Sequence, residues 1–241
     1  TGQEYRLESI TTEYIRIEKG LSQNSSNIVF QDSKGYLWVG TWSGLNRFDG
    51  YNFKTLSKSV HRPETSLTNA TIVGIAEDND GYIWAATTQG LNRIDPESFE
   101  IKKFTTQDHA KKGFVSDSLS TIFKDSKGNL WLGTNQGAIK LDPKSESFLQ
   151  YHHNPRDSRT LSSRFVTVFE EDTTGNIWIG TRDGLNLLNN SNGQIIRFNA
   201  KLGPGYLNSP EIHDLEFCQE GFLWIATTRG LNRMETDTKW F

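Results

Sequence analysis

Residues 32–49 read DSKGYLWVGTWSGLNRFD, and four later stretches of the chain repeat this phrase with small changes. The repeats are DNDGYIWAATTQGLNRID (78–95), DSKGNLWLGTNQGAIKLD (125–142), DTTGNIWIGTRDGLNLLN (172–189) and CQEGFLWIATTRGLNRME (218–235). Their tryptophans, Trp38, Trp84, Trp131, Trp178 and Trp224, are 46, 47, 47 and 46 residues apart. A period of this length with strand-like patterns inside it predicts stacked structural repeats.

Each repeat carries the pattern of four short strands. In the first repeat these are residues 27–32, 36–41, 45–49 and 52–56, separated by turns that contain glycine. Four antiparallel strands in a repeat of this size are typical of one propeller blade. The chain is therefore predicted to be all-β, a propeller of four-stranded blades forming a single domain over 1–241. The expected blades are 20–57, 66–104, 114–152, 161–199 and 208–241, with a further strand at 13–18.

The recurring residues have structural roles in this interpretation. Each tryptophan is expected to cover its blade and to pack against the neighbouring blade, because burial of such a ring contributes a few kcal/mol. The two glycines of each repeat stand where tight turns need a positive φ. The aspartate that opens the phrase is expected to accept backbone N–H groups of the turn. Cys218 takes that aspartate's place in the fifth repeat, so we interpret it as a turn residue and not a nucleophile.

Composition excludes several classes of function. The net charge of −3 leaves no electrostatic footprint for nucleic acid. A single cysteine cannot form an intrachain disulfide. The sequence has no apolar run of about 18 residues and no signal peptide at its start, so any membrane attachment is expected outside this segment. No metal-ligand spacing, phosphate-binding loop or nucleophile elbow is present, so neither a cofactor nor a catalytic residue is predicted.

Two blade arrangements fit the repeats. In one, five blades close a ring, with Tyr14–Ile17 pairing beside Leu231–Met234. In the other, the five blades belong to a larger ring.

The phrase resembles the repeat of the two-component regulator propellers, with about a dozen positions recurring in all five units. The third unit departs at Ala138, Ile139 and Lys140, and the fourth at Leu187. The resemblance implies the periplasmic sensor region of a membrane-bound bacterial signalling protein whose output is a histidine kinase or a diguanylate cyclase. It also implies ligands such as polysaccharide fragments, and rings that commonly have seven blades, which favours the larger ring here.

The residues just before the second turn glycine do not repeat, although the framework around them does. The loops that enter the blades are equally varied, at Asn24–Asn27, Asn69–Thr71, Ser116–Ser118, Ser163–Phe165 and Glu211–His213. Loops on a rigid scaffold that vary in this way are where binding specificity resides. Trp42 offers a stacking surface for a sugar ring, and Arg182 or Arg229 could pair with a uronate carboxylate. The predicted ligand-binding residues are Trp42, Gln89, Gln136, Arg182, Asp183, Arg229 and His213.

The leading hypothesis is thus a non-enzymatic, extracytoplasmic ligand-sensing propeller that recognises an oligosaccharide or another small molecule. A carbohydrate-active or lyase-type propeller enzyme is the first alternative. A protein–protein surface that holds a sensor homodimer together is the second. The enzymatic alternative needs a catalytic set, but the five histidines are scattered and form no spaced set of metal ligands. His152 and His153 follow an outer strand and are expected to be exposed.

Overall fold

The computed structural model describes residues 16–59, 61, 65–199, 206–218 and 220–236. The predicted all-β fold is confirmed, with four sheets of four antiparallel strands and a fifth sheet in which three strands are described. The strands are β1 (Ser26–Gln31), β2 (Leu37–Thr41), β3 (Leu45–Phe48), β4 (Phe53–Leu56), β5 (Ile72–Glu77), β6 (Ile83–Thr87), β7 (Gly90–Ile94), β8 (Ile101–Phe104), β9 (Leu119–Lys124), β10 (Leu130–Thr134), β11 (Gly137–Asp142), β12 (Ser147–Tyr151), β13 (Val166–Glu171), β14 (Ile177–Thr181), β15 (Gly184–Leu188), β16 (Ile195–Phe198), β17 (Ile212–Phe217), β18 (Phe222–Thr227) and β19 (Gly230–Glu235).

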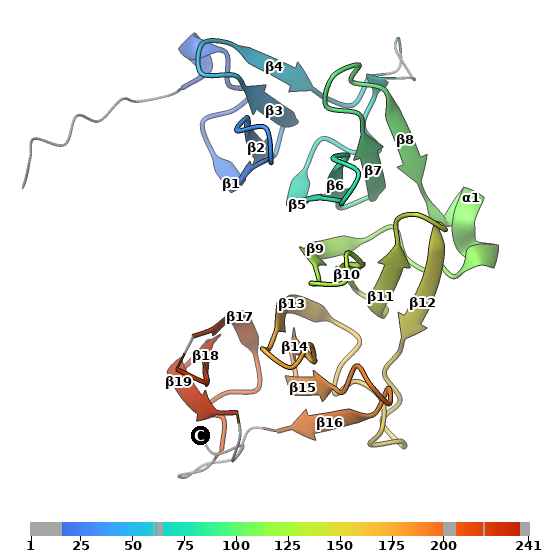
Figure 1. Cartoon of the computed structure of the whole chain (residues 1–241), viewed down its shortest axis with the longest axis vertical. Helices are drawn as coiled ribbons and strands as arrows, with labels where there is room; N and C mark the ends of the chain where they lie inside the picture. The colour runs from blue at the N-terminus through green and yellow to red at the C-terminus, as the bar shows by residue number, and fades with distance from the viewer. Residues whose placement is uncertain (1–15, 60, 62–64, 200–205, 219, 237–241) are drawn as a thin grey trace, which may run out of the picture.

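Each sheet is one blade, and its strands pair in sequence order from the inside outwards. The first strands, β1, β5, β9, β13 and β17, lie side by side around the inner edge, and β4, β8, β12 and β16 lie at the periphery (Figure 1). In the described part of the chain the blades form an open arc, since the first and fifth blades face each other across its open side (Figure 1). A closed ring of five blades is not what these residues form.

Among the described residues, three short helical turns have defined bounds. Between β8 and β9, the connection forms α1 (Thr106–His109) and η3 (Ala110–Lys112) at the outer edge of the arc (Figure 1). The third, η1 (Ile17–Lys19), falls where the sequence predicted the end of a strand at 13–18. That prediction is wrong at Ile17, because the N–H of Gly20, in the left-handed conformation, donates to the Ile17 carbonyl and closes a 3₁₀ turn. Residues 13–15 of the expected strand and 237–241 of the fifth blade lie outside the described residues.

The repeating tryptophan of one blade is buried against the next blade. Trp38 packs with Leu67, Ile72 and Ile75 of the second blade, and Trp84, Trp131 and Trp178 are buried in the same way. Trp224 of the fifth blade is 37% exposed instead. The expectation that each ring covers a blade interface is confirmed where a following blade is present.

The two ends of the arc expose side chains that the internal interfaces bury. Val29, on the inner strand of the first blade, is 60% exposed, whereas Ile75 at the equivalent position of the second blade is 5% exposed. At the other end, Leu231 is 61% exposed, although its equivalent Leu91 is fully buried. Each end of the arc therefore carries half of a blade interface.

The aspartate that opens each repeat has a larger role than the sequence suggested. Asp78 accepts the backbone N–H groups of Asp80 and Tyr82, as predicted for a turn. Its second carboxylate oxygen also accepts a 2.7 Å hydrogen bond from Nε1 of the buried Trp84. The same bond joins Asp32 to Trp38, Asp125 to Trp131 and Asp172 to Trp178. The carboxylate thus satisfies a buried donor as well as the turn, because a polar group buried without a partner is costly.

A hydrogen-bonded polar pair, buried or half-buried, is present in four blades and is replaced in the third. In the second blade, Asn92 donates to Thr68 Oγ1 and accepts from the Thr68 backbone N–H. Equivalent pairs are Asn46 with Ser22, Asn186 with Ser162, and Asn232 with Asn208. The third blade has Ile139 and Val115 at these positions, packed in one apolar cluster. Both partners of the pair are apolar in the third blade, so neither position leaves a buried polar group without a hydrogen bond.

Candidate functional site

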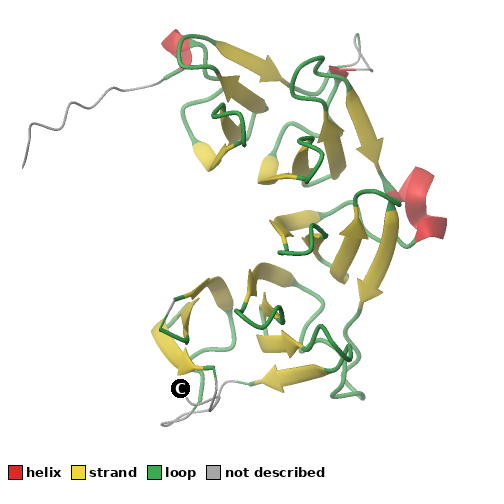
Figure 2. Ribbon diagram, in the orientation of Figure 1, coloured by secondary structure: helices red, strands yellow, loops and turns green. Residues whose placement is uncertain are grey.

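The candidate site is one face of the arc, which we call the loop face. It consists of the turn between the second and third strands of every blade and the loop that leads into the first strand. Figure 2 shows the strands of each blade that these turns and loops connect. The two turn residues of the successive blades are Trp42–Ser43, Thr88–Gln89, Asn135–Gln136, Arg182–Asp183 and Thr228–Arg229.

A buried threonine at the end of the second strand fixes each turn. In the second blade, the Thr87 hydroxyl donates to the Gly90 carbonyl at 2.7 Å and accepts the Gln89 N–H at 3.1 Å. The same two bonds occur at Thr41, Thr134, Thr181 and Thr227. Gly137 shows why the next residue is glycine, because a Cβ there would lie 2.2 Å from the Tyr151 carbonyl oxygen. The backbone of these turns is therefore invariant, and their two side chains are what differs.

The first side chain of each turn contacts the start of the first strand or its lead-in loop in the same blade. The Thr88 hydroxyl donates to Asn69 at 3.2 Å, and Asn135 accepts from Ser116 at 2.9 Å. In the fifth blade, Thr228 and Ser209 are hydrogen-bonded at 2.6 Å. Hydrogen bonds therefore connect these turn side chains to the inner part of the same blade.

Trp42 is the large apolar side chain of the loop-face turns and is 63% exposed. Its Nε1 donates a hydrogen bond to Oδ1 of Asn27, and its backbone N–H donates to Gln23 at 3.2 Å. Asn27 in turn donates to the Ile72 carbonyl of the second blade at 3.0 Å. The indole is thus an exposed surface in a fixed orientation, which is the property that a stacking platform requires.

The second side chain of each turn points away from the framework. Gln89, Gln136, Asp183 and Arg229 are exposed, and their backbone N–H groups are the ones held by the threonines. Their side chains offer amide, carboxylate and guanidinium groups for hydrogen bonding to a ligand.

His213 lies on a strand and not in a turn, unlike the other predicted site residues. It is exposed and occupies a β-bulge of β17, between the paired residues Ile212 and Asp214. Asn27 occupies the corresponding bulge of β1, where it receives the indole of Trp42. His213 therefore stands at the loop-face end of an inner strand, where bulges re-aim side chains.

Sequence reasoning missed Asn27, Arg164 and Phe165 as individual site residues, because only the loops containing them were recognised as variable. The guanidinium carbon of Arg182 lies 5.1 Å from the centre of the Phe165 ring, and that of Arg164 lies 4.6 Å from it. A search for basic residues flanking an aromatic one in the lead-in loops could have found this group.

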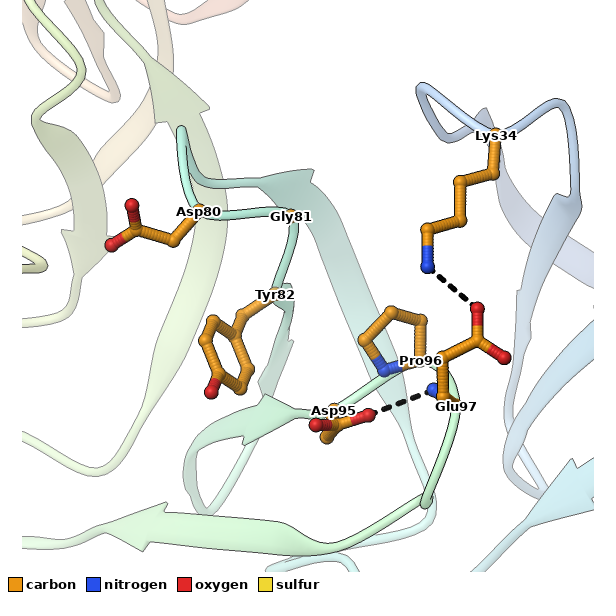
Figure 3. A pocket seen from close by; sticks show the side chains of 7 residues that line it. All are labelled: Lys34, Asp80, Gly81, Tyr82, Asp95, Pro96 and Glu97. Carbon is orange, nitrogen blue, oxygen red and sulfur yellow. Dashed lines mark hydrogen bonds and ion pairs between the residues drawn. The ribbon is translucent and has the colours of Figure 1, made fainter.

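The opposite face carries small hollows between blades. One of about 170 Å³ is lined by Lys34 of the first blade and by Tyr82, Asp95 and Glu97 of the second. In Figure 3 the Lys34 ammonium points at Glu97, with 2.5 Å between Nζ and Oε1. A similar hollow of about 140 Å³ lies between the second and third blades. Because the hollow recurs with the repeat, we interpret it as a consequence of blade packing.

The described residues also bear on the enzymatic alternative. Among them, no group of three or more His, Cys, Asp and Glu side chains is arranged to hold a metal ion. His152 is exposed as expected, but His153 is half-buried, contrary to expectation. The reason is a 2.7 Å hydrogen bond from His153 Nδ1 to the Leu161 carbonyl, which ties the loop between β12 and β13.

Comparison with known proteins identifies the repeat. The two component regulator propeller family matches residues 20–43, 66–89, 113–136 and 160–183. A 35-residue stretch is 60% identical to histidine kinase P4 of Formosa agariphila, covering 14% of this chain and 3% of that protein.

Two solved structures place the fold among known propellers. The extracellular domain of a hybrid two component system from B. thetaiotaomicron superposes with a TM-score of 0.80 and 26% identity, over 95% of this chain and 31% of that one. Virginiamycin B lyase from Staphylococcus aureus superposes with a TM-score of 0.63 and 16% identity, over 87% of this chain and 66% of that one. The second likeness shows the fold alone. This chain spans about a third of the hybrid system's domain.

Proposed function

We propose that this chain of two component regulator propeller repeats is part of the ligand-sensing region of a bacterial signal-transduction protein, located in the periplasm. The likeness to the extracellular domain of a hybrid two component system and to a stretch of a histidine kinase supports the signalling context. No helix among the described residues is long and apolar enough to span a membrane. The kinase or cyclase output of such a protein is part of the proposal.

The observation that carries this proposal is the contrast between framework and turn side chains on the loop face. Five turns share one backbone and one threonine clamp, yet no two of them carry the same pair of side chains. A purely structural surface does not require rigid turns with variable side chains. In a binding surface, a rigid backbone positions the ligand-contacting side chains precisely.

An oligosaccharide is the ligand class that the loop-face chemistry favours. Trp42 presents an immobilised indole to solvent, and Gln89 and Gln136 present amides. Aromatic rings stack on the apolar faces of sugars, and amides both donate to and accept from hydroxyl groups.

A lyase or another propeller enzyme is the alternative, because virginiamycin B lyase shares the fold. It would need a group that bonds to the reacting atoms of a substrate on the loop face. His213 is the exposed histidine at the loop-face end of an inner strand, so it is the residue on which to test this alternative.

The experiment is a thermal-shift screen of the purified chain against a library of neutral and acidic oligosaccharides, with each mixture analysed for products by chromatography. Sensing predicts that at least one oligosaccharide raises Tm and is recovered unchanged, since a ligand that binds only the folded state stabilises it. Product formation that is lost in His213→Ala would establish the enzyme instead. A library without any effect on Tm would contradict the carbohydrate assignment.

The exposed ends of the arc support a second proposal, that further blades complete the ring. Val29 and Trp224 belong to positions that are buried wherever two blades meet. A homodimer that covers these side chains is the competing arrangement. Analytical ultracentrifugation of this chain distinguishes the two arrangements. A homodimer predicts a sedimenting mass that increases with concentration, whereas a chain that needs further blades should sediment as a monomer at every concentration.

A further inference from the structure

Charge is distributed unevenly over the loop face. In the first three blades, all six turn residues are uncharged: Trp42, Ser43, Thr88, Gln89, Asn135 and Gln136. Charged turn residues appear in the fourth and fifth blades, as Arg182, Asp183 and Arg229. The lead-in loop of the fourth blade adds Arg164, at a position where the other blades have Asn24, Ala70, Asp117 and Pro210. The fourth blade therefore brings two arginines to the loop face from two different segments.

Both arginines lie against one aromatic ring. The guanidinium carbons of Arg164 and Arg182 are 4.6 and 5.1 Å from the centre of the Phe165 ring. The backbone N–H of Arg182 also donates to the Phe165 carbonyl at 3.1 Å, which ties the turn to the lead-in loop. Two cations are thus held at one half-buried ring that attracts both of them.

The positive charge of this pair is not compensated within the described residues. Both side chains are exposed, and neither guanidinium forms an ion pair with any carboxylate of the described chain. Asp183 follows Arg182 directly, but its hydrogen bond runs from its own backbone N–H to the Thr181 hydroxyl. Other arginines are paired, as Arg93 is with Asp78 and Arg159 is with Asp157.

An oxyanion is the group that this arrangement suits. Two like charges held near one ring repel each other, and an anion between them converts the repulsion into two attractions. Each guanidinium presents a planar fork of N–H donors that matches the oxygens of a carboxylate or a sulfate. The apolar Phe165 ring near each guanidinium lowers the local dielectric, which strengthens both attractions.

We propose that Arg164, Arg182 and Phe165 form an anion subsite that receives the carboxylate or sulfate group of an acidic oligosaccharide. The assignment of an oligosaccharide rests on the proposed function, whereas the oxyanion preference rests on the arginine pair alone. The ligand's neutral sugar units then lie toward the uncharged turns of the first three blades.

The test uses arginine side-chain NMR of the whole chain, titrated with trigalacturonate and, separately, with its methyl ester as a neutral twin. A sulfated galactose trimer is the third titrant and distinguishes sulfate from carboxylate recognition. Binding at the subsite shifts the Nε–H signals of Arg164 and Arg182 with the acidic trimers and leaves them in place with the ester. The control is Arg156→Gln, which removes the same charge from an exposed turn of the same β12–β13 connection, eight residues before Arg164.

The double variant Arg164→Gln/Arg182→Gln is expected to bind the favoured acidic trimer at least about tenfold more weakly, because two charge-assisted bonds are lost. Arg156→Gln is expected to bind it as the unaltered chain does. Three results would overturn the subsite. The unaltered chain could bind the acidic trimer and the ester with equal affinity, or the double variant could bind the acidic trimer as tightly as the unaltered chain does. The third is that neither acidic trimer shifts the Nε–H signal of Arg164 or Arg182. A neutral sugar that raises Tm independently of both arginines would leave the sensing function standing while overturning the subsite. Conversely, an acidic trimer could shift the Nε–H signals of both arginines while no oligosaccharide raises Tm. That result would support the anion subsite and contradict the sensing of oligosaccharides.

Discussion

Nε1 of Trp84 donates a 2.7 Å hydrogen bond to Oδ2 of Asp78, six residues earlier in the same blade. Both side chains are buried, and the other carboxylate oxygen holds the turn between them. This single carboxylate couples the first hairpin of the blade to the ring that fills the interface with the next blade.

Asp78→Ala is therefore expected to lower the free energy of unfolding by about 1–3 kcal/mol, because the Trp84 N–H is left buried without an acceptor. Cys218→Ala, at the same position of the fifth blade, is the matched control and should cost less than about 1 kcal/mol. Urea denaturation followed by tryptophan fluorescence measures both changes. Equal losses in the two variants would show that the carboxylate has no special role.

The hydrogen-bonded pair of Asn186 and Ser162 in the fourth blade tests whether the stabilities of the two positions are coupled. Asn186→Ile alone removes the acceptor of the buried Ser162 N–H and the donor to its hydroxyl, so a cost of about 1–3 kcal/mol is expected. The double change Asn186→Ile/Ser162→Val recreates the apolar pair found in the third blade. It should cost less than the sum of the single changes, as a double-mutant cycle will show. Additive costs would mean that the third blade tolerates its apolar pair for another reason.

Leu91 and Leu231 occupy equivalent positions, but Leu91 is buried between two blades and Leu231 is exposed at the end of the arc. Substitution by alanine should therefore lower the free energy of unfolding by different amounts at the two positions. Leu91→Ala should destabilise the chain by about 2–5 kcal/mol, because it opens a cavity in a packed interface. Leu231→Ala should cost less than about 1 kcal/mol, since its side chain is largely exposed. Chemical denaturation of the two variants makes the comparison. Similar losses at both positions would indicate a closed ring.

The raised pKa of Glu170 predicts that the stability of the chain depends on pH. Burial at the interface with the fifth blade raises the pKa of its carboxyl to about 7, helped by Glu216, Asp214 and Glu171 and opposed by the hydrogen bond from the Phe217 N–H. Because the pKa in the folded state lies above the ordinary value of 4.5, folding favours the protonated form. This contribution is complete below about pH 4.5 and is lost as the pH rises to about 7.

Glu170→Gln keeps an acceptor for Phe217 and removes the charge. The variant should therefore have a higher Tm than the unaltered chain at pH 8, and the difference should disappear near pH 4.5. Melting curves across this range, recorded for both proteins, provide the measurement. A constant difference at every pH would show that the carboxyl does not titrate in this window.

The sequence was sufficient for the fold because the determinants of a blade are local. Turn glycines, the alternation of residues 36–41 and the spacing of the tryptophans all act within one repeat. The bond between Asp78 and Trp84 was not foreseen, because it depends on both side chains turning to the same face of the hairpin. The strand expected through Ile17 failed because a local turn at Gly20 prevailed over the alternating pattern.

The candidate site was predicted only in part. The turn residues could be located from the repeat register, since they are the positions at which the units differ. The partners of these turn residues could not be located. Asn27 at the start of β1 is 15 residues away from Trp42, and Phe165 in a lead-in loop is 17 residues away from Arg182. Contacts across that separation follow from how the hairpin stacks on its inner strand, which no local pattern encodes.

A ligand on the loop face is expected to bind by stacking on the exposed indole of Trp42. Calorimetric titration of an oligosaccharide that raises Tm tests it most directly, with the unaltered chain, Trp42→Ala and Tyr51→Ala compared. Tyr51 is the matched control, because it is an exposed aromatic residue in the turn between β3 and β4, on the opposite face. Binding to Trp42→Ala is expected to be at least about tenfold weaker, since a stacked aromatic ring is a typical hot spot, and binding to Tyr51→Ala is expected to be unchanged. Equal affinities of Trp42→Ala and the unaltered chain would contradict it.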